Sequence, residues 1–123
     1  MGGAEGLDYP GFCRVVWREH VREISDLTNT ERHHLMTVVF AVEAALRLLY
    51  RPLKINLASL GNVTPHLHWH VIPRFADDPH FPAPIWATEK RRPAPSIVRP
   101  VIDSTELLEA IRLALAEGQA GDA

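Results

Sequence analysis

The distribution of proline constrains the fold of this 123-residue chain more than any other feature of its sequence. Of the 10 prolines, all except Pro10 lie between Pro52 and Pro100. Proline lacks a backbone N–H and breaks the interior of a helix, so long helices are not expected through that stretch. The helices and strands should therefore lie before it, in its proline-free gaps, and after it.

The bulk composition predicts one soluble globular domain over residues 1–123, because 46% of the residues are hydrophobic and the length suits a single core. The net charge of -2 offers no global field for nucleic acid or an anionic membrane, so neither is an expected partner. Cys13 is the only cysteine, which excludes an intrachain disulfide and a cysteine-based zinc site within this sequence. We recognise no export signal and no membrane-spanning run, and we expect a cytoplasmic protein.

Two segments have the pattern of amphipathic helices. Thr28 and Glu31 have the spacing of a capping box at a helix start, and Pro52 prevents the helix from continuing beyond Tyr50. Between these limits the apolar residues form one stripe at helical spacing: Leu35, Val38, Val39, Val42, Leu46 and Leu49. A second, short helix is predicted from about Asp103 to Gly118.

Three segments have the composition of β-strands, namely residues 12–17, 54–60 and 66–72. Residues 1–9 have little pattern and are predicted to be disordered, and residues 74–100 are predicted to form a proline-rich loop. The fold class that follows is α+β, with an antiparallel sheet, one long helix and a short C-terminal helix.

The third predicted strand carries a row of histidines. Side chains two residues apart on a strand point to the same face, about 6.5–7 Å apart, so His66, His68 and His70 should form a row of imidazoles. The residues between and after them are apolar and should face the core: Leu67, Trp69 and Val71.

Such a row suits three kinds of role. A middle histidine can attack phosphorus while its neighbours hold its tautomer and move protons. The same imidazoles can instead bind zinc, or they can form a polar strand face that has no chemical function. No acidic residue between Glu43 and Asp77 is available to orient metal-bound histidines, whereas neutral hydrogen-bonding groups flank the row, which favours phosphate. These groups are Asn56, Ser59, Asn62 and Thr64.

The run from Pro65 to Ile72, Pro-His-Leu-His-Trp-His-Val-Ile, resembles the signature of the histidine triad (HIT) family of nucleotide hydrolases and transferases. Residues 56–62, the pair Pro73-Arg74, and the order strand, His20, helix, strand, triad resemble bacterial members of the dinucleoside polyphosphate hydrolase-like branch. The likeness covers about residues 12–86 and implies a HIT-like sheet and a homodimer.

The resemblance implies a reaction at the α-phosphate of a nucleoside phosphate derivative, either a dinucleoside polyphosphate or a nucleoside phosphoramidate. His68 would be the nucleophile and form a nucleotidyl-histidine, while His66 and His70 align it and assist proton transfer. No metal and no other cofactor is required by such a mechanism. The alternatives are a zinc-dependent hydrolase that uses the same histidines and a non-catalytic nucleotide-binding module.

Six further side chains are predicted to bind the substrate. His20 and Trp86 come from the resemblance, since family members often place a histidine and a tryptophan near the site. The others have hydrogen-bonding side chains close to the histidines in the sequence: Asn56, Asn62, Ser59 and Thr64. His33 and His34 lie on the predicted helix beside charged residues, and we expect them to be solvated.

The sequence also departs from the family pattern. Members typically have an N-terminal hairpin strand, often with a cysteine pair, before the segment that matches residues 12–17. Here eleven residues precede Phe12 and no cysteine pair is present, so either the start is truncated or the sheet is smaller.

Overall fold

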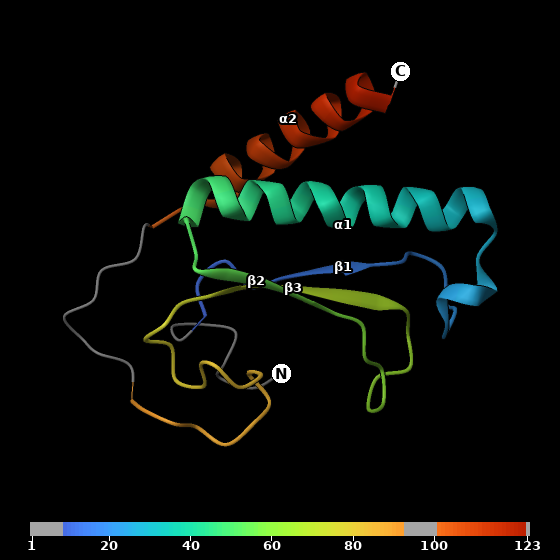
Figure 1. Ribbon diagram of the computed structural model, residues 1–123. Coiled ribbons are helices and arrows are strands. Elements are labelled where there is room, and N and C mark those ends of the chain that lie inside the picture. Colours follow the sequence, from blue (N-terminus) through green and yellow to red (C-terminus); the bar gives the residue numbers. More distant parts are fainter. Residues whose placement is uncertain (1–8, 93–100, 123) are drawn as a thin grey trace.

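The computed structural model describes residues 9–92 and 101–122, which form an α+β fold as predicted (Figure 1). The predicted disorder of residues 1–8 and the loop segment 93–100 lie outside the described residues. The elements in chain order are β1 (Cys13–Val16), a short 3₁₀ helix (Ile24–Asp26), α1 (Asn29–Tyr50), β2 (Lys54–Ala58), β3 (His68–Arg74) and α2 (Ser104–Asp122).

The long helix α1 begins and ends as the sequence predicts. The Thr28 hydroxyl accepts a hydrogen bond from the Glu31 backbone N–H at 3.2 Å, and the Glu31 carboxylate accepts one from the Thr28 N–H at 2.8 Å. At the other end Arg51 adopts a left-handed conformation with φ of 47°, directly before Pro52. Local chemistry therefore sets both ends of α1.

The described strands form one antiparallel sheet in the order β1-β3-β2, so β3 is the central strand. One face of this sheet lies under α1, and α2 packs on the side of α1 away from the sheet (Figure 1). The main core fills the space between α1 and the sheet, where Leu35, Val39 and Leu46 meet Ile55, Leu67 and Val71. The opposite face of β3 carries His68, His70, Ile72 and Arg74.

Several predicted boundaries require correction. The strand β3 begins at His68, because the Leu67 N–H donates to the Val21 carbonyl and Leu67 accepts from Trp17 in the loop after β1. His66 therefore precedes the strand and does not lie on it. The strand β2 ends at Ala58, before the predicted end at Leu60.

The C-terminal helix is not short, because α2 continues to Asp122 over 19 residues. A glycine inside a helix costs only about 1 kcal/mol relative to alanine, so Gly118 does not end it. None of the described helices has the length and apolar character that crossing a membrane requires.

Tyr9 belonged to the segment predicted as a disordered end, but its side chain is completely buried. Its hydroxyl lies 3.2 Å from the Asp78 carboxylate and 2.6 Å from the His80 ring, and its ring packs with Ile72 and Ile85. Residues 75–92 thus form an ordered covering over one end of the sheet face that carries the histidines.

Candidate active site

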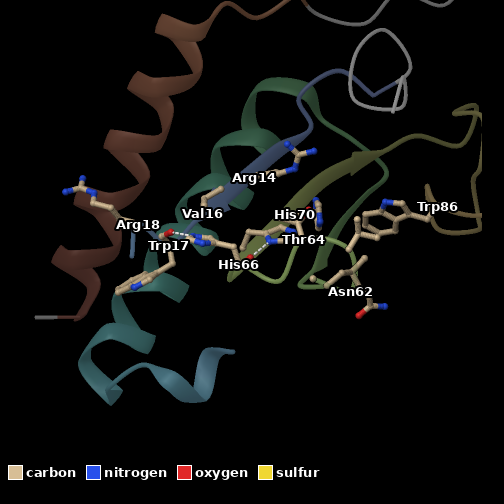
Figure 2. Close-up of a pocket in the computed structure, with 13 residues that line it drawn as sticks. Arg14, Val16, Trp17, Arg18, Asn62, Thr64, His66, His70 and Trp86 are labelled. Carbon is tan, nitrogen blue, oxygen red and sulfur yellow. Dashed lines mark hydrogen bonds between the residues drawn. The ribbon is translucent and has the colours of Figure 1, made fainter. Parts of the chain in front are cut away.

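A pocket of about 1170 Å³ opens on the sheet face opposite α1 and contains all three histidines of the row. Figure 2 shows that its walls come from β1, from the loop before β3, and from the segment that carries Trp86. The neighbours of the histidines in the pocket include Arg14, Val16, Asn62, Thr64 and Trp86.

His68 is held in one tautomer by the backbone. Its Nδ1 lies 2.5 Å from the carbonyl oxygen of His66, and a carbonyl can only accept, so Nδ1 carries the hydrogen. In a neutral imidazole the other nitrogen, Nε2, then has the lone pair. The hydroxyl of Ser59 donates to the His68 carbonyl at 2.7 Å and fixes the backbone of the same residue. His68 therefore offers the pocket a nucleophilic nitrogen with a defined position.

His66 is held by a second backbone carbonyl. Its Nε2 donates to the Trp17 carbonyl at 2.5 Å, which leaves Nδ1 as the acceptor nitrogen of the neutral ring. The Nδ1 of His20 lies 3.2 Å from this atom and can donate to it. The structure thus brings His20 to the histidine row, where the sequence placed it by resemblance.

His70 is the most deeply buried member of the row, with 4% of its surface exposed. Its ring meets three others edge to face, with centroid distances of 4.9 Å to His68, 5.2 Å to Trp86 and 5.6 Å to Phe12. Trp86 is half exposed and lines the pocket, so it offers a free aromatic surface beside His70.

The predicted substrate-binding residues divide into two groups. His20, Asn62, Thr64 and Trp86 lie in the pocket or touch its histidines, and Ser59 supports the His68 backbone. Asn56 is not among the residues that line the pocket. Its side-chain oxygen accepts a hydrogen bond from the Arg74 guanidinium at 2.8 Å, and this contact belongs to a buried network at the other end of β3.

That network centres on a buried ion pair that the sequence analysis missed. The Arg74 guanidinium binds both carboxylate oxygens of Asp78, at 2.8 Å and 3.0 Å, and these side chains are 2% and 1% exposed. The Asp78 carboxylate also accepts hydrogen bonds from the backbone N–H groups of Phe75, His80 and Phe81. Burial alone would raise the pKa of Asp78, but Arg74 and these N–H groups lower it to about 2.

The network orders the loop that delivers Trp86. Arg74 also donates to the Ala83 carbonyl at 2.7 Å, two residues before the buried Ile85. Ile85 packs on Tyr9 and Ile72, and Trp86 follows it directly beside His70. The spacing of Arg74 and Asp78, four residues apart, was the signal in the sequence. Nothing in the surrounding proline-rich segment indicated that this pair would be buried.

The strand β1 also contributes to the pocket, which was not predicted from the sequence. Arg14 and Val16 pair in register with His70 and His68, so they share the face of the row. Alternation with the apolar residues Cys13 and Val15 was the available signal, since it directs Arg14 and Val16 away from the core.

The described part of the pocket lining carries positive charge, although the whole chain has a net charge of -2. Arg14 and Arg18 line the pocket, and among residues 9–92 and 101–122 no aspartate or glutamate joins them in the lining. Within residues 9–92 and 101–122, no cluster of three or more His, Cys, Asp or Glu side chains is arranged to hold a metal ion. The surroundings of His68 therefore favour an anionic ligand.

Comparison with known proteins gives a consistent picture. The family model of the HIT domain matches residues 8–77. Proteins named AP-4-A phosphorylase from two strains of Mycobacterium tuberculosis are 32% identical over 78 residues. This match covers 58% of the chain and 40% of each relative, so the chain matches less than half of their length.

Solved structures resemble a larger part of the chain. A histidine triad protein from Bradyrhizobium japonicum is 32% identical with a TM-score of 0.62, over 90% of this chain and 76% of that one. A histidine triad protein from Sinorhizobium meliloti is 29% identical with a TM-score of 0.62, over 89% of this chain and 75% of that one. One from Marinobacter aquaeolei is 30% identical with a TM-score of 0.62, over 88% of this chain and 72% of that one.

Proposed function

The chain belongs to the HIT domain family, and we propose that it transfers a nucleotidyl group from a nucleoside phosphate derivative through a covalent intermediate on His68. The bond that breaks joins the α-phosphorus to its leaving group. The substrate is a dinucleoside polyphosphate or a nucleoside phosphoramidate, and the group that finally accepts the nucleotide is water or another nucleophile.

The tautomer of His68 is the observation that carries this proposal. Since Nδ1 donates to the His66 carbonyl, the lone pair of Nε2 forms the bond to phosphorus without a prior proton transfer. The ring becomes positively charged as that bond forms, and the carbonyl oxygen of His66 stabilises the charge. The charge also makes the ring a good leaving group when the acceptor attacks and the P–N bond breaks.

The neighbouring histidines support proton movement around this centre. The leaving group departs with the bonding electron pair and takes up a proton, which His66 or His70 is proposed to supply; the His70 ring lies 4.9 Å from that of His68. Asn62 and Thr64 line the pocket and are proposed to bind the phosphate oxygens. The mechanism requires no metal, so we expect turnover to survive treatment with a chelator.

The name of the relatives concerns the group that accepts the nucleotide from His68. A phosphorylase, by its name, uses inorganic phosphate where a hydrolase uses water. We therefore propose diadenosine tetraphosphate as the first substrate to test, with and without added phosphate. An increase in rate with phosphate and a nucleoside diphosphate product would identify a transferase, and turnover to AMP in its absence would identify a hydrolase.

Mass spectrometry of the intact protein after rapid quenching tests the intermediate. We expect one added nucleotidyl group in the wild type, located on His68 by peptide mapping, and none in H68A. The variant H33A is the matched control, because His33 is exposed on α1. Turnover without any adduct would contradict the proposal, as would stoichiometric zinc whose removal abolishes activity. Nucleotide binding without turnover in the wild type would support a binding module instead.

We also propose a homodimer, which the family resemblance implies. Phe40 and Leu48 are eight residues apart on α1 and are 58% and 67% exposed, so one side of this helix presents apolar surface to a partner. The mass of the protein by light scattering tests this proposal, and a monomer at micromolar concentration would contradict it.

A further inference from the structure

We propose that His20 is a positioning residue that holds the His66 ring, and with it the backbone carbonyl that fixes the tautomer of His68. The inference rests on the proposed function, because this contact serves catalysis only if His68 is the nucleophile. It also assigns His66 to positioning and not to the transfer of a proton to the leaving group.

The carbonyl of His66 lies outside the sheet. His66 precedes β3, which begins at His68, and its backbone N–H donates to the Thr64 carbonyl at 2.8 Å within the same loop. This carbonyl nevertheless accepts the hydrogen bond from Nδ1 of His68 and so sets the orientation of the nucleophile. Its position therefore depends on contacts with another part of the chain.

The loop after β1 provides those contacts along the backbone. The Trp17 N–H donates to the Leu67 carbonyl at 3.1 Å, and the Leu67 N–H donates to the Val21 carbonyl at 2.8 Å. The Leu67 N–H and the His66 carbonyl belong to one peptide plane, so the bond to Val21 fixes one end of that plane. The other end leads to the α-carbon and the side chain of His66.

The same loop binds the His66 side chain through both of its ring nitrogens. Nε2 donates to the Trp17 carbonyl at 2.5 Å, which Figure 2 shows as a dashed line, and Nδ1 lies 3.2 Å from Nδ1 of His20. Because Nε2 carries the hydrogen, Nδ1 of the neutral His66 ring is an acceptor and Nδ1 of His20 is the donor. The two rings are tilted by 39°, with their centroids 5.3 Å apart. His20 and Val21, which are adjacent in this loop, therefore hold the adjacent residues His66 and Leu67.

These contacts leave His66 without a free ring nitrogen. A proton donor for the leaving group needs an N–H directed toward that group, and both nitrogens of His66 already have partners in the protein. The pair of His20 and His66 is therefore suited to holding the His66 carbonyl in place, and not to protonating the group that leaves.

The variants H20A and H20N separate the hydrogen bond from the rest of the side chain. Alanine removes the donor to His66, whereas the amide N–H of asparagine can take the place of Nδ1–H and donate to the same atom. His20 is exposed, so neither change opens a cavity in the core. The matched controls are H33A and H33N, because His33 is exposed on α1.

Nitrogen NMR of the histidine side chains tests the contact directly. At about pH 8, where free imidazole is neutral, two-bond ¹H–¹⁵N correlation spectra show which ring nitrogen carries the hydrogen. We expect the wild type and H33A to have the hydrogen on Nδ1 of His68 and on Nε2 of His66. In H20A the His68 signals should show a mixture of both tautomers, and H20N should restore the Nδ1–H form. A pure Nδ1–H form of His68 in H20A would overturn the inference.

Kinetics with two leaving groups test the assignment of His66 to positioning. The p-nitrophenyl ester of AMP releases a group that departs without a proton, whereas an adenosine phosphoramidate releases an amine that needs one. We expect H20A to lower kcat by about 10-fold on both substrates, the effect of losing one hydrogen bond, and H20N to recover most of it. H33A and H33N should change neither value. A loss confined to the phosphoramidate would overturn the assignment, because His20 and His66 would then deliver the proton.

The spectra separate this inference from the proposed reaction, because they do not depend on turnover. An inactive wild type with the expected tautomers, altered in H20A and restored in H20N, would contradict the proposed catalysis and support the contact. Conversely, an active enzyme that keeps its kcat in H20A would support the catalysis and overturn the role of His20.

Discussion

The two ends of one face of β3 differ sharply in whether their polar side chains face an open pocket or are buried. At one end His68 and His70 face an open pocket, and at the other end Arg74 is sealed beneath the loop of residues 75–92. The two ends are separated only by Ile72, which packs on Tyr9 and Ile85.

The two ends also differ in how much of their hydrogen-bonding capacity the polar side chains keep for a ligand. Asp78 uses its carboxylate on Arg74 and on three backbone N–H groups, and Arg74 also binds Asn56 and the Ala83 carbonyl. His68 donates one hydrogen bond to the backbone, which orients the ring and leaves a lone pair toward the pocket. We conclude that the Arg74 end maintains the structure and that the His68 end is available for chemistry.

The largest effect should come from replacing His68, because a nucleophile has no substitute in the pocket. We expect H68N to lower kcat by about 10⁴-fold or more, while the free energy of unfolding stays close to that of the wild type. Steady-state kinetics and urea unfolding on the same preparation measure both quantities. An active H68N would remove the basis for assigning chemistry to this end of the face.

Replacing Asp78 should give the opposite result. The change D78N leaves the buried guanidinium of Arg74 without a carboxylate, and we expect the free energy of unfolding to fall by about 3–5 kcal/mol. The matched control is E109Q, because the Glu109–Arg112 pair on α2 is exposed and 3.9 Å apart. We expect E109Q to change stability by less than about 1 kcal/mol. Similar unfolding curves for the two variants would contradict the structural role of the network.

The same network predicts how stability depends on pH. The pKa of Asp78 is lowered from 3.8 to about 2 in the folded protein, so its contribution is complete above pH 4 to 5 and is lost as the pH falls toward 2. The shift corresponds to about 2 kcal/mol of unfolding free energy. Urea unfolding between pH 6 and pH 2 should show a steeper loss in the wild type than in D78N. Parallel curves would mean that Asp78 titrates alike in the folded and unfolded chain.

The smallest effect in this comparison should come from Asn56, which the sequence analysis assigned to the substrate. We expect N56A to lower the free energy of unfolding by about 1–2 kcal/mol, because it removes an acceptor of Arg74. The kcat/KM of the folded protein should stay near the wild-type value. N62A, in the pocket, should instead lower kcat/KM with little change in stability. A large loss of kcat/KM in N56A would show that Asn56 contributes to substrate binding or catalysis.

Local sequence patterns were sufficient for the parts of the molecule that depend on near neighbours. The capping box of Thr28 and Glu31 and the proline after Arg51 define α1, since the interacting groups are within a few residues of each other. Alternation placed His68 and His70 on one face and Trp69 and Val71 on the other, because successive side chains of a strand point to opposite faces.

The tertiary structure alone decided which partners the polar residues found. Asn56 and Arg74 are 18 residues apart, and Tyr9 and Asp78 are 69 apart, so no local pattern could pair them. The exclusion of His66 from β3 and the placement of Arg14 beside His70 likewise depend on which backbone groups meet across strands. The sequence by itself therefore determined the helix α1 and the shared face of His68 and His70, because near neighbours set them. Long-range packing was needed to join Asn56 to Arg74 of the buried ion pair and to place Arg14 in the pocket.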